Sequence, residues 1–339
     1  MSREPILLPT LPPDDEDRDL RPQHMGEMIG QREVYARLQI AIDAAMKRRE
    51  PLGHILFDGP PGLGKTTFAM CIPRDLGVPF QIAIGATLKA PKDVIPYLTN
   101  AEERSILFID EIHRMQKTVE EFLYPAMEDF RIDLTLGEGL NARTINMPLK
   151  PFTLIGATTR TGLLSAPLRD RFQMQQHLDF YSLDELAEIV RRNSRKLRIE
   201  IDEASALEIA GRSRGTPRVA NNRLRWVRDY ATSRHDGPVT REVACTALDM
   251  LGIDATGLDP QDRKYLETVG RVFGGGPVGV EAVAHTMNLT LDTLIDEVEP
   301  FLLRSELIVR TPRGRKLTAQ GFERAGLTPP SDTGQQQLF

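Results

Sequence analysis

The clearest chemical pattern in the sequence is a glycine-rich segment that ends in a lysine and a threonine. Residues 59–66 read GPPGLGKT, which has the G-x4-G-K-T spacing of a phosphate-binding loop. Glycines allow consecutive backbone N–H groups to surround phosphate oxygens at the start of a helix. The Lys65 ammonium would reach the β- and γ-phosphates, and the Thr66 hydroxyl would ligate Mg²⁺. The segment predicts that the chain binds a nucleoside triphosphate.

Two acids at the end of an apolar run form the second pattern. Residues 106–111 read ILFIDE, so that Asp110 and Glu111 come directly after a run typical of a buried strand. Asp110 suits Mg²⁺ coordination through water, and Glu111 suits a general base that orients the attacking water. On their own, two solvated acids at a strand end would be an ordinary finding. Beside a phosphate-binding loop they predict ATP hydrolysis in addition to binding.

The elements that must position these residues follow from short apolar runs separated by helical segments. The runs are bounded by turn residues and are rich in residues that favour strands, which indicates a buried parallel sheet and an α/β fold. They cover residues 54–59, 79–84, 105–110 and 152–158. Between the last two, residues 131–149 alternate around a glycine-rich turn, which predicts a β-hairpin.

The pattern changes after Tyr181. Ser182 and Glu185 have the spacing of a capping box, and residues 182–252 are expected to be helical. A third segment has helices, the turn GGGPVG and a short ribbon with a basic tip, which is typical of a winged helix. The expected divisions are an N-terminal tail 1–19, an ATPase domain 20–181, a small helical domain 182–254, a winged-helix domain 255–330 and a tail 331–339.

Composition limits the class of protein and its surroundings. Hydrophobic residues make up 40% and charged residues 27% of the 339 residues, as in ordinary globular proteins. No apolar run approaches the ~20 residues that cross a bilayer, and the N-terminus lacks the pattern of a signal peptide. The two cysteines, Cys71 and Cys245, lie far apart in the sequence, which favours a reducing cytoplasm over a disulfide or zinc framework.

The net charge of −5 conceals clusters of opposite sign. Residues 14–19 contain five acids, whereas residues 212–234 contain seven arginines and one acid. Residues 310–316 contain four cations and no acid. Such basic clusters suit an anionic partner such as nucleic acid, although most are simply solvated.

With these patterns in place, the sequence resembles the RuvB family of AAA+ ATPases, over about residues 20–325. The resemblance rests on an ordered series of motifs: GPPGLGKTT, LFIDEIHR, VEEFLYPAMED, FTLIGATTR, PLRDRF, RGTPR, GGPVG and RTPRGR. It implies an ATP-driven motor for Holliday junction branch migration in recombination and DNA repair. It further implies a homohexameric ring around duplex DNA, a junction-binding partner of the RuvA type, and a larger complex with the resolvase RuvC.

The resemblance assigns roles to residues that spacing alone leaves open. Thr159 matches a sensor of the γ-phosphate or the attacking water, and Arg171 matches an arginine finger that enters the neighbouring subunit's site, although Arg169 could be confused with it. Arg218 matches a second sensor on the helical domain. Further nucleotide contacts are expected at Leu20, Arg21, Gly62, Gly64, Lys65, Thr66, Thr67, Glu128, Asp129, Phe130 and Tyr181.

Two surfaces for other partners are also implied. The resemblance implies that Ile145 and Met147 on the 131–149 hairpin belong to the element that engages the junction-binding partner. Exposed apolar residues on a protruding hairpin are also typical of a protein interface. The alternative is that the hairpin packs on its own domain. Arg310 and Arg315 bracket the tip of the ribbon and match DNA contacts; phosphate contacts of this kind carry no sequence preference.

The chain departs from the family pattern at three places, and two other functions compete with the motor. Ala83–Ala86, Asn222–Trp226 and Gly274 replace residues that the family commonly has. A clamp-loader-type assembly factor on DNA would share the ATPase core without a DNA-contacting winged helix. A winged-helix regulator with a nucleotide-sensing domain would read bases and hydrolyse ATP weakly, yet Glu111 and Arg171 are both present.

Overall fold

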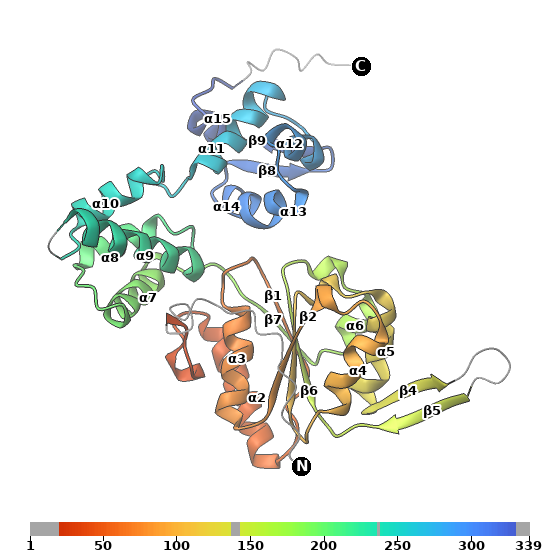
Figure 1. Ribbon diagram of the computed structural model, residues 1–339. Helices are drawn as coiled ribbons and strands as arrows, with labels where there is room; N and C mark the ends of the chain where they lie inside the picture. The colour runs from red at the N-terminus through yellow and green to blue at the C-terminus, as the bar shows by residue number, and fades with distance from the viewer. Residues whose placement is uncertain (1–19, 137–142, 236–237, 330–339) are drawn as a thin grey trace, which may run out of the picture. The chain divides into compact units, whose positions relative to one another are not determined.

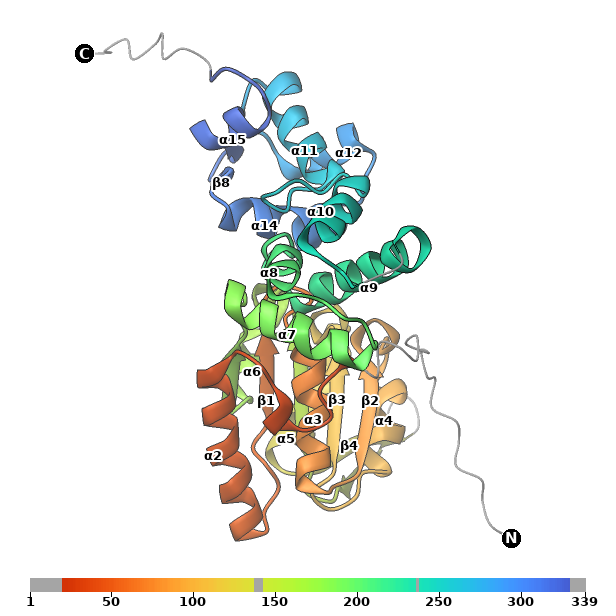
Figure 2. The ribbon, with the colours of Figure 1, turned by 90° about the vertical axis from the view of Figure 1, so that its left-hand side faces the viewer.

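Residues 20–136, 143–235 and 238–329 are described by a computed structural model (Figures 1 and 2). The expected tails, with the acidic run 14–19, therefore lie outside the described residues, as does the tip of the 131–149 hairpin. Within the described ranges the chain forms two compact units. The first, here the sheet unit, contains residues 20–59, 64–179 and 192–199. The second, here the helical unit, contains residues 60–63, 180–191 and 200–329.

A five-stranded parallel sheet forms the centre of the sheet unit, in the order β2-β3-β6-β1-β7. The strands are β1 (Ile55–Asp58), β2 (Phe80–Ile84), β3 (Ile106–Asp110), β6 (Thr153–Thr158) and β7 (Met174–His177). The four apolar runs of the sequence are therefore confirmed as strands. Every β6 residue is buried, as expected of a central strand covered on both faces.

Helices cover both faces of this sheet (Figure 1). The helices α2 (Arg32–Arg48) and α3 (Lys65–Leu76) lie on one side. On the other side lie α4 (Pro91–Thr99), α5 (Lys117–Glu128) and α6 (Ala166–Asp170). The short 3-10 turns are Met25–Glu27, Gly85–Thr87, Ile112–Arg114 and Thr161–Leu163. A buried cluster that includes Leu107, Ile109, Leu123 and Leu154 joins the sheet to these helices.

The predicted hairpin is present as the antiparallel pair β4 (Arg131–Leu136) and β5 (Arg143–Pro148), which extends away from the sheet (Figure 1). Ile132 at its base is fully buried. The pair stands outside the five-stranded sheet, so the crossover from β3 to β6 carries it as an insertion.

Four helices follow, here called the lid helices: α7 (Leu183–Lys196), α8 (Glu203–Gly211), α9 (Pro217–Arg234) and α10 (Arg241–Met250). They belong to the helical unit, except for the last residues of α7 from Arg192 on, which group with the sheet unit. The predicted capping box starts α7, because the Ser182 hydroxyl accepts from the Glu185 N–H and the Glu185 carboxylate accepts from the Ser182 N–H. Pro217 starts α9, where the missing N–H of proline costs nothing.

The winged-helix elements complete this unit. They are α11 (Pro260–Glu267), α12 (Val280–Met287), α13 (Leu291–Thr293), α14 (Glu299–Arg304), β8 (Ile308–Thr311), β9 (Gly314–Leu317) and α15 (Ala319–Arg324), with π-helical turns at Thr268–Val272 and Leu294–Val298. Arg214 of the lid forms ion pairs with Asp259 and Asp262 at the start of α11. These ion pairs join the lid to the winged-helix elements within the helical unit. The domain bounds expected from the sequence stay a prediction.

Candidate nucleotide site and DNA surface

The carboxyl ends of three adjacent strands define one edge of the sheet. Strand β6 lies between β1 and β3, and Asp58 of β1 pairs with Thr158 of β6. Asp110 ends β3, and the residue before it, Ile109, pairs with Gly156 of β6. In open parallel sheets ligands bind beyond the carboxyl ends of the strands. The residues that follow these strands are therefore placed to form a nucleotide site.

The loop after β1 has the shape that a phosphate cradle requires. Gly59, Gly62 and Gly64 all have positive φ angles, of 131°, 80° and 104°. Gly59 must also be glycine for space, since a Cβ there would lie 2.3 Å from the Leu178 carbonyl oxygen. Lys65 begins α3, and its buried ammonium donates to the Gly59 carbonyl at 2.7 Å. The lysine thus lies folded along the loop whose phosphate it would bind; Thr67 follows within the first turn of α3.

The two predicted Mg²⁺ ligands are in contact. The Thr66 hydroxyl donates to Asp110 Oδ2 at 3.0 Å, which joins the start of α3 to the end of β3. Hydroxyl and carboxylate oxygens are the ligands that Mg²⁺ takes when it also binds phosphates, and it usually needs only one or two from the protein. The pair fits a nucleotide-bound Mg²⁺.

Glu111 follows directly and has an unusual backbone. Its φ of 48° lies in the left-handed region, which is uncommon for residues other than glycine. The carboxylate is half-exposed and forms an ion pair with Arg114 at 2.9 Å. This left-handed residue ends β3. The Glu111 N–H donates to Asp110 Oδ1 at 3.0 Å.

The end of β6 brings a histidine into this edge. Thr158 is buried, and its hydroxyl bonds His113 Nδ1 at 2.9 Å while accepting the Arg160 N–H at 2.9 Å. Thr159, the predicted sensor, is the next residue and is half-buried. It follows the strand that separates β1 from β3, which is a position between the phosphate loop and the acids. No sequence pattern pointed to the Thr158–His113 contact, because Thr158 ends β6 whereas His113 follows β3.

Arg171 lies near the amino ends of the strands, opposite to the carboxyl ends that carry Lys65 and Asp110. It comes just before β7, whose first residue Met174 pairs with Ile55 at the start of β1. Its guanidinium contacts Glu128 at 3.0 Å, donates to the Pro167 carbonyl at 2.7 Å and lies 4.2 Å from the centre of the Tyr124 ring. Arg169, the residue that could be confused with it, forms no ion pair with Asp170 among the described contacts.

Glu128, Asp129 and Phe130 accompany Arg171 instead of the phosphate loop. Glu128 ends α5, and Phe130 packs against the rings of His54 and Phe152, which precede β1 and β6. The structure therefore does not bring these three residues to the edge that carries Lys65. That these three residues contact a nucleotide stays a prediction; within this chain they lie at the opposite end of the strands from Lys65.

Leu20 and Arg21 belong to a segment that packs along α3. Leu20 is fully buried, and the following residues are tied to the helix by contacts from the Pro22 carbonyl to Cys71 and from the Met25 N–H to Asp75. Burial raises the pKa of the Cys71 thiol to about 12, so this cysteine stays protonated. The first residues of the described chain therefore lie beside the helix that Lys65 begins.

In the helical unit, two predicted nucleotide residues contact the middle of the phosphate loop. The buried Tyr181 hydroxyl donates to the Leu63 carbonyl at 3.2 Å. The Arg218 N–H approaches the Gly62 carbonyl at 3.4 Å, and a Cβ on Gly62 would lie 3.1 Å from Arg218 Cβ. Arg218 is exposed in the first turn of α9. Both residues thus lie within reach of a ligand held by residues 60–63.

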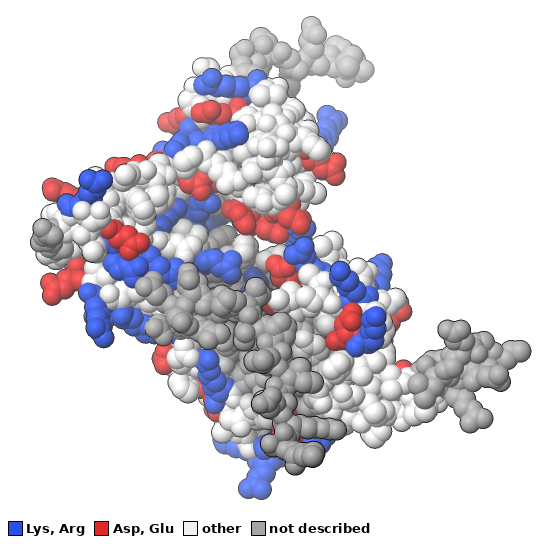
Figure 3. Space-filling view, viewed as in Figure 1, with Lys and Arg blue, Asp and Glu red and all other residues white. Residues whose placement is uncertain are grey.

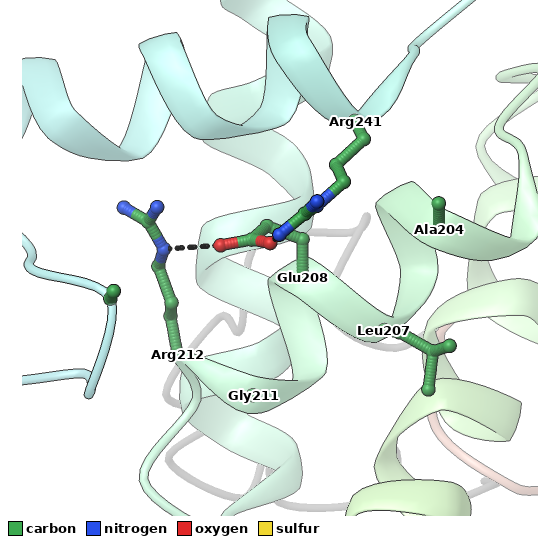
Figure 4. Close-up of a pocket in the computed structure, with 7 residues that line it drawn as sticks. Ala204, Leu207, Glu208, Gly211, Arg212 and Arg241 are labelled. Atoms are coloured by element: carbon green, nitrogen blue, oxygen red, sulfur yellow. Dashed lines mark hydrogen bonds and ion pairs between the residues drawn. The ribbon is translucent and has the colours of Figure 1, made fainter.

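The arginine-rich segment 212–234 is not a continuous cationic surface. Arg212 and Arg223 are buried, and Arg212 is paired with Glu208 and Asp249. Burial lowers the pKa of Arg223 to about 10. Basic and acidic side chains both appear over the lid helices in Figure 3. A hollow in the lid holds Glu208 between Arg212 and Arg241, so opposite charges compensate each other along its lining (Figure 4).

The two hairpin residues predicted to bind a partner differ in their exposure. Ile145 is 49% exposed on β5. Met147 instead is half-buried, pairs with the buried Ile132 and packs against the core of the sheet unit. Met147 therefore packs within its own domain, and its contact with a partner stays a prediction.

The ribbon of the winged helix carries both predicted DNA contacts. Arg310 and Arg315 are direct cross-strand neighbours on β8 and β9. Both form ion pairs with Glu299, at 2.7 and 2.8 Å. The side chain of Arg310 is 49% exposed and that of Arg315 is 19% exposed.

A five-stranded parallel sheet with a phosphate loop after β1, two consecutive acids at the end of β3 and a helical lid defines a P-loop ATPase of the AAA+ class. Three family models match consecutive segments: the Holliday junction DNA helicase RuvB P-loop domain over residues 20–178, the RuvB AAA lid domain over 181–254, and the RuvB C-terminal winged helix domain over 255–325. The chain belongs to the RuvB family.

Individual relatives agree with this assignment. The chain is 66% identical over 309 residues to the Holliday junction branch migration complex subunit RuvB of Rhodopirellula baltica, covering 91% of this chain and 84% of that one. It is 49% identical to the protein of the same name from Paramagnetospirillum magneticum, covering 96% and 94%. The solved Thermotoga maritima RuvB Holliday junction branch migration motor superposes with a TM-score of 0.85 at 42% identity, covering 92% of this chain and 100% of that one. None of the described helices is long and apolar enough to cross a membrane.

Proposed function

We propose that this chain hydrolyses ATP to pump duplex DNA through a ring of subunits and so drives Holliday junction branch migration in recombination and DNA repair. The observation that carries the proposal is the contact between Thr66 and Asp110 beside Lys65 and Glu111, on a chain that also carries a winged helix. Nucleotide chemistry and a DNA-binding module within one chain are what such a motor needs.

Each residue of the carboxyl edge takes one part of the reaction. Lys65 and the loop N–H groups bind the phosphates, and Thr66 and Asp110 hold Mg²⁺. Bound Mg²⁺ would neutralise charge on the phosphate oxygens. Glu111 orients the attacking water and accepts its proton, and Thr159 contacts the γ-phosphate or that water. Arg218 and Tyr181 report the bound nucleotide to the lid.

The position of Arg171 supports a ring. It precedes β7 and contacts Glu128 and Tyr124, at the opposite end of the strands from Lys65, so we propose that it enters the site of a neighbouring subunit. Glu128, Asp129 and Phe130 lie beside it and would approach that same neighbouring nucleotide. Sites shared between adjacent copies close most simply into a cyclic homo-oligomer, here proposed to be a hexamer.

The remaining surfaces suit the partners of a branch-migration complex. The exposed Ile145 would dock on a junction-binding protein of the RuvA type, and the assembly would admit a RuvC resolvase. Arg310 and Arg315 would contact phosphates of duplex DNA without reading its sequence. We place this work in the cytoplasm, where the free Cys71 and Cys245 remain reduced.

The competing clamp-loader function shares the ATPase core. It is disfavoured because residues 255–325 match a RuvB winged helix, which a clamp loader does not need. No described feature favours the regulator, since the ribbon offers arginines and no base-reading aromatic pattern.

A synthetic four-way junction tests the proposal. We expect ATP-dependent conversion of the junction into two duplexes when a RuvA-type partner is added, and no conversion by Lys65→Ala, which lacks the ammonium that binds phosphate. Clamp loading without junction conversion would favour the competing function. Conversion at parental rate by Lys65→Ala would contradict the proposed use of the loop.

A further inference from the structure

A fully buried carboxylate lies beneath the two arginines of the winged-helix ribbon. Glu299 is the first residue of α14, and its exposed fraction is 0%. Three side chains from three other elements converge on it: Tyr265 of α11, Arg310 of β8 and Arg315 of β9. These elements lie together in the winged-helix domain (Figures 1 and 2).

The carboxylate uses both oxygens to hold the arginines. Glu299 Oε2 accepts from Arg310 Nη2 at 2.7 Å and Nε at 3.2 Å, and from Arg315 Nη2 at 3.2 Å. Oε1 accepts from Arg315 Nε at 2.8 Å and from the Tyr265 hydroxyl at 3.1 Å. Each guanidinium therefore directs its Nε and Nη2 at Glu299. Neither Nη1 has a hydrogen-bond partner among the described residues.

This arrangement solves a problem that the ribbon creates. Arg310 and Arg315 are directly opposite each other, and like charges at such positions repel. Glu299 compensates one of the two charges, so that the three groups together carry one positive charge. It also fixes the two long side chains, which otherwise lose conformational freedom on meeting a ligand.

We propose that Glu299 is a positioning residue for DNA: it holds Arg310 and Arg315 in one orientation so that their remaining N–H donors meet backbone phosphates. This inference rests on the proposed function, because it takes duplex DNA as the ligand of the ribbon. Tyr265 supports the carboxylate from the interior, where burial raises the pKa of its hydroxyl and keeps it a donor.

Removing the charge of Glu299 separates positioning from plain electrostatics. Glu299→Gln makes the surface of the ribbon more positive, so electrostatic attraction alone would tighten DNA binding. Positioning predicts the reverse: binding to duplex of any sequence weakens roughly tenfold, as for the removal of one charge-assisted hydrogen bond. The slope of log affinity against log salt should fall by about 1 for each phosphate that the arginines no longer reach.

Glu297→Gln is the matched control. It removes the same charge two residues earlier, from an exposed side chain. We expect unchanged or slightly tighter DNA binding and an unchanged salt slope. Equal or tighter binding by Glu299→Gln, as by this control, would overturn the inference.

A second variant and a second comparison keep the outcome decisive. Where thermal unfolding shows that Glu299→Gln has lost the winged-helix fold, Tyr265→Phe decides: weaker DNA binding supports the inference, and parental binding overturns it.

Arg310→Ala combined with Arg315→Ala tests the DNA surface itself. Parental DNA binding by that double variant means that the proposed DNA surface has failed, whereas weak binding there beside strong binding by Glu299→Gln means that only the role of Glu299 has failed.

Discussion

Gly85 lies so close to Glu111 that a Cβ built on it would be 2.2 Å from the Glu111 carbonyl oxygen. Gly85 follows β2, and Glu111 follows the neighbouring strand β3, so the two loops are in direct backbone contact. The φ angle of Gly85 is ordinary, and the need for glycine here is one of space. Any side chain at position 85 would displace the backbone of the proposed catalytic base.

We therefore expect Gly85→Ala to reduce ATP hydrolysis while leaving nucleotide binding largely intact, because phosphate contacts come from a different loop. A general base contributes about 10²–10⁴-fold, which bounds the reduction. Steady-state turnover and the affinity for a fluorescent nucleotide measure the two effects. Gly26→Ala serves as control, since a Cβ there meets nothing within 4 Å. Equal turnover in both variants would show that the contact does not constrain Glu111.

Glu111→Gln tests the base directly. The amide keeps the size of the side chain and its hydrogen-bonding capacity but cannot accept the proton of the attacking water. We expect ATP and Mg²⁺ to bind as in the parent and hydrolysis to fall by about 10²–10⁴-fold. Near-normal turnover would reassign the base to another residue.

Arg171→Ala tests catalysis across subunits. The variant should bind ATP and lose hydrolysis, by about 10³-fold or more if the guanidinium stabilises the transition state. Mixing it with Glu111→Gln creates interfaces that pair an intact arginine with an intact glutamate, and turnover should partly return. Mixed rings of verified composition that stay inactive would mean that Arg171 acts within its own chain.

Asp262 should make the helical unit less stable as the pH rises. Burial raises its pKa to about 7, although Arg214 and Arg223 oppose the shift and Asp259 adds to it. Between about pH 4 and pH 7 the folded chain then holds one proton more than the unfolded chain. The free energy of unfolding should fall across this window, by at most about 1.4 kcal/mol per pH unit.

Trp226, the single tryptophan of the chain, reports this unfolding, because its indole N–H donates to the Ala247 carbonyl within the lid. Denaturant titrations at several pH values should give a steeper decline for the parent than for Asp262→Asn, whose amide oxygen can still accept the Asp259 N–H. Parallel declines would assign the proton to another group.

The sequence predicted the parts of the site that follow one another along the chain. The phosphate loop, the acids after β3, the hairpin and the ribbon each have a local pattern of residue types that specifies a local backbone. Contacts between segments left no such pattern. The alternating pattern of β5 predicted that Ile145 and Met147 lie on one face of the hairpin. It did not show that Ile145 is exposed whereas Met147, nearer the base, packs against the core.

Charge counting failed for a related reason. Seven arginines in residues 212–234 suggest a cationic surface, but Arg212 and Arg223 are buried in the lid. The charge of Arg212 is compensated by acids from α8 and α10. Conversely, Glu299 carried no signal, because a single glutamate before a proline is typical of an exposed helix start. Its two arginine partners became visible only when the fold brought three elements together.

The separation of Arg171 from Lys65 by the length of the sheet has a consequence for populations of molecules. If Arg171 acts on the neighbouring site, as proposed above, a lone chain would possess every group that the reaction needs and yet complete no site, so its rate of ATP hydrolysis should rise more steeply than its concentration until rings form. A chain that lacks both Glu111 and Arg171 silences the site that it carries and the site next door. In cells that contain intact and damaged copies together, the defect would therefore spread beyond the damaged copies themselves.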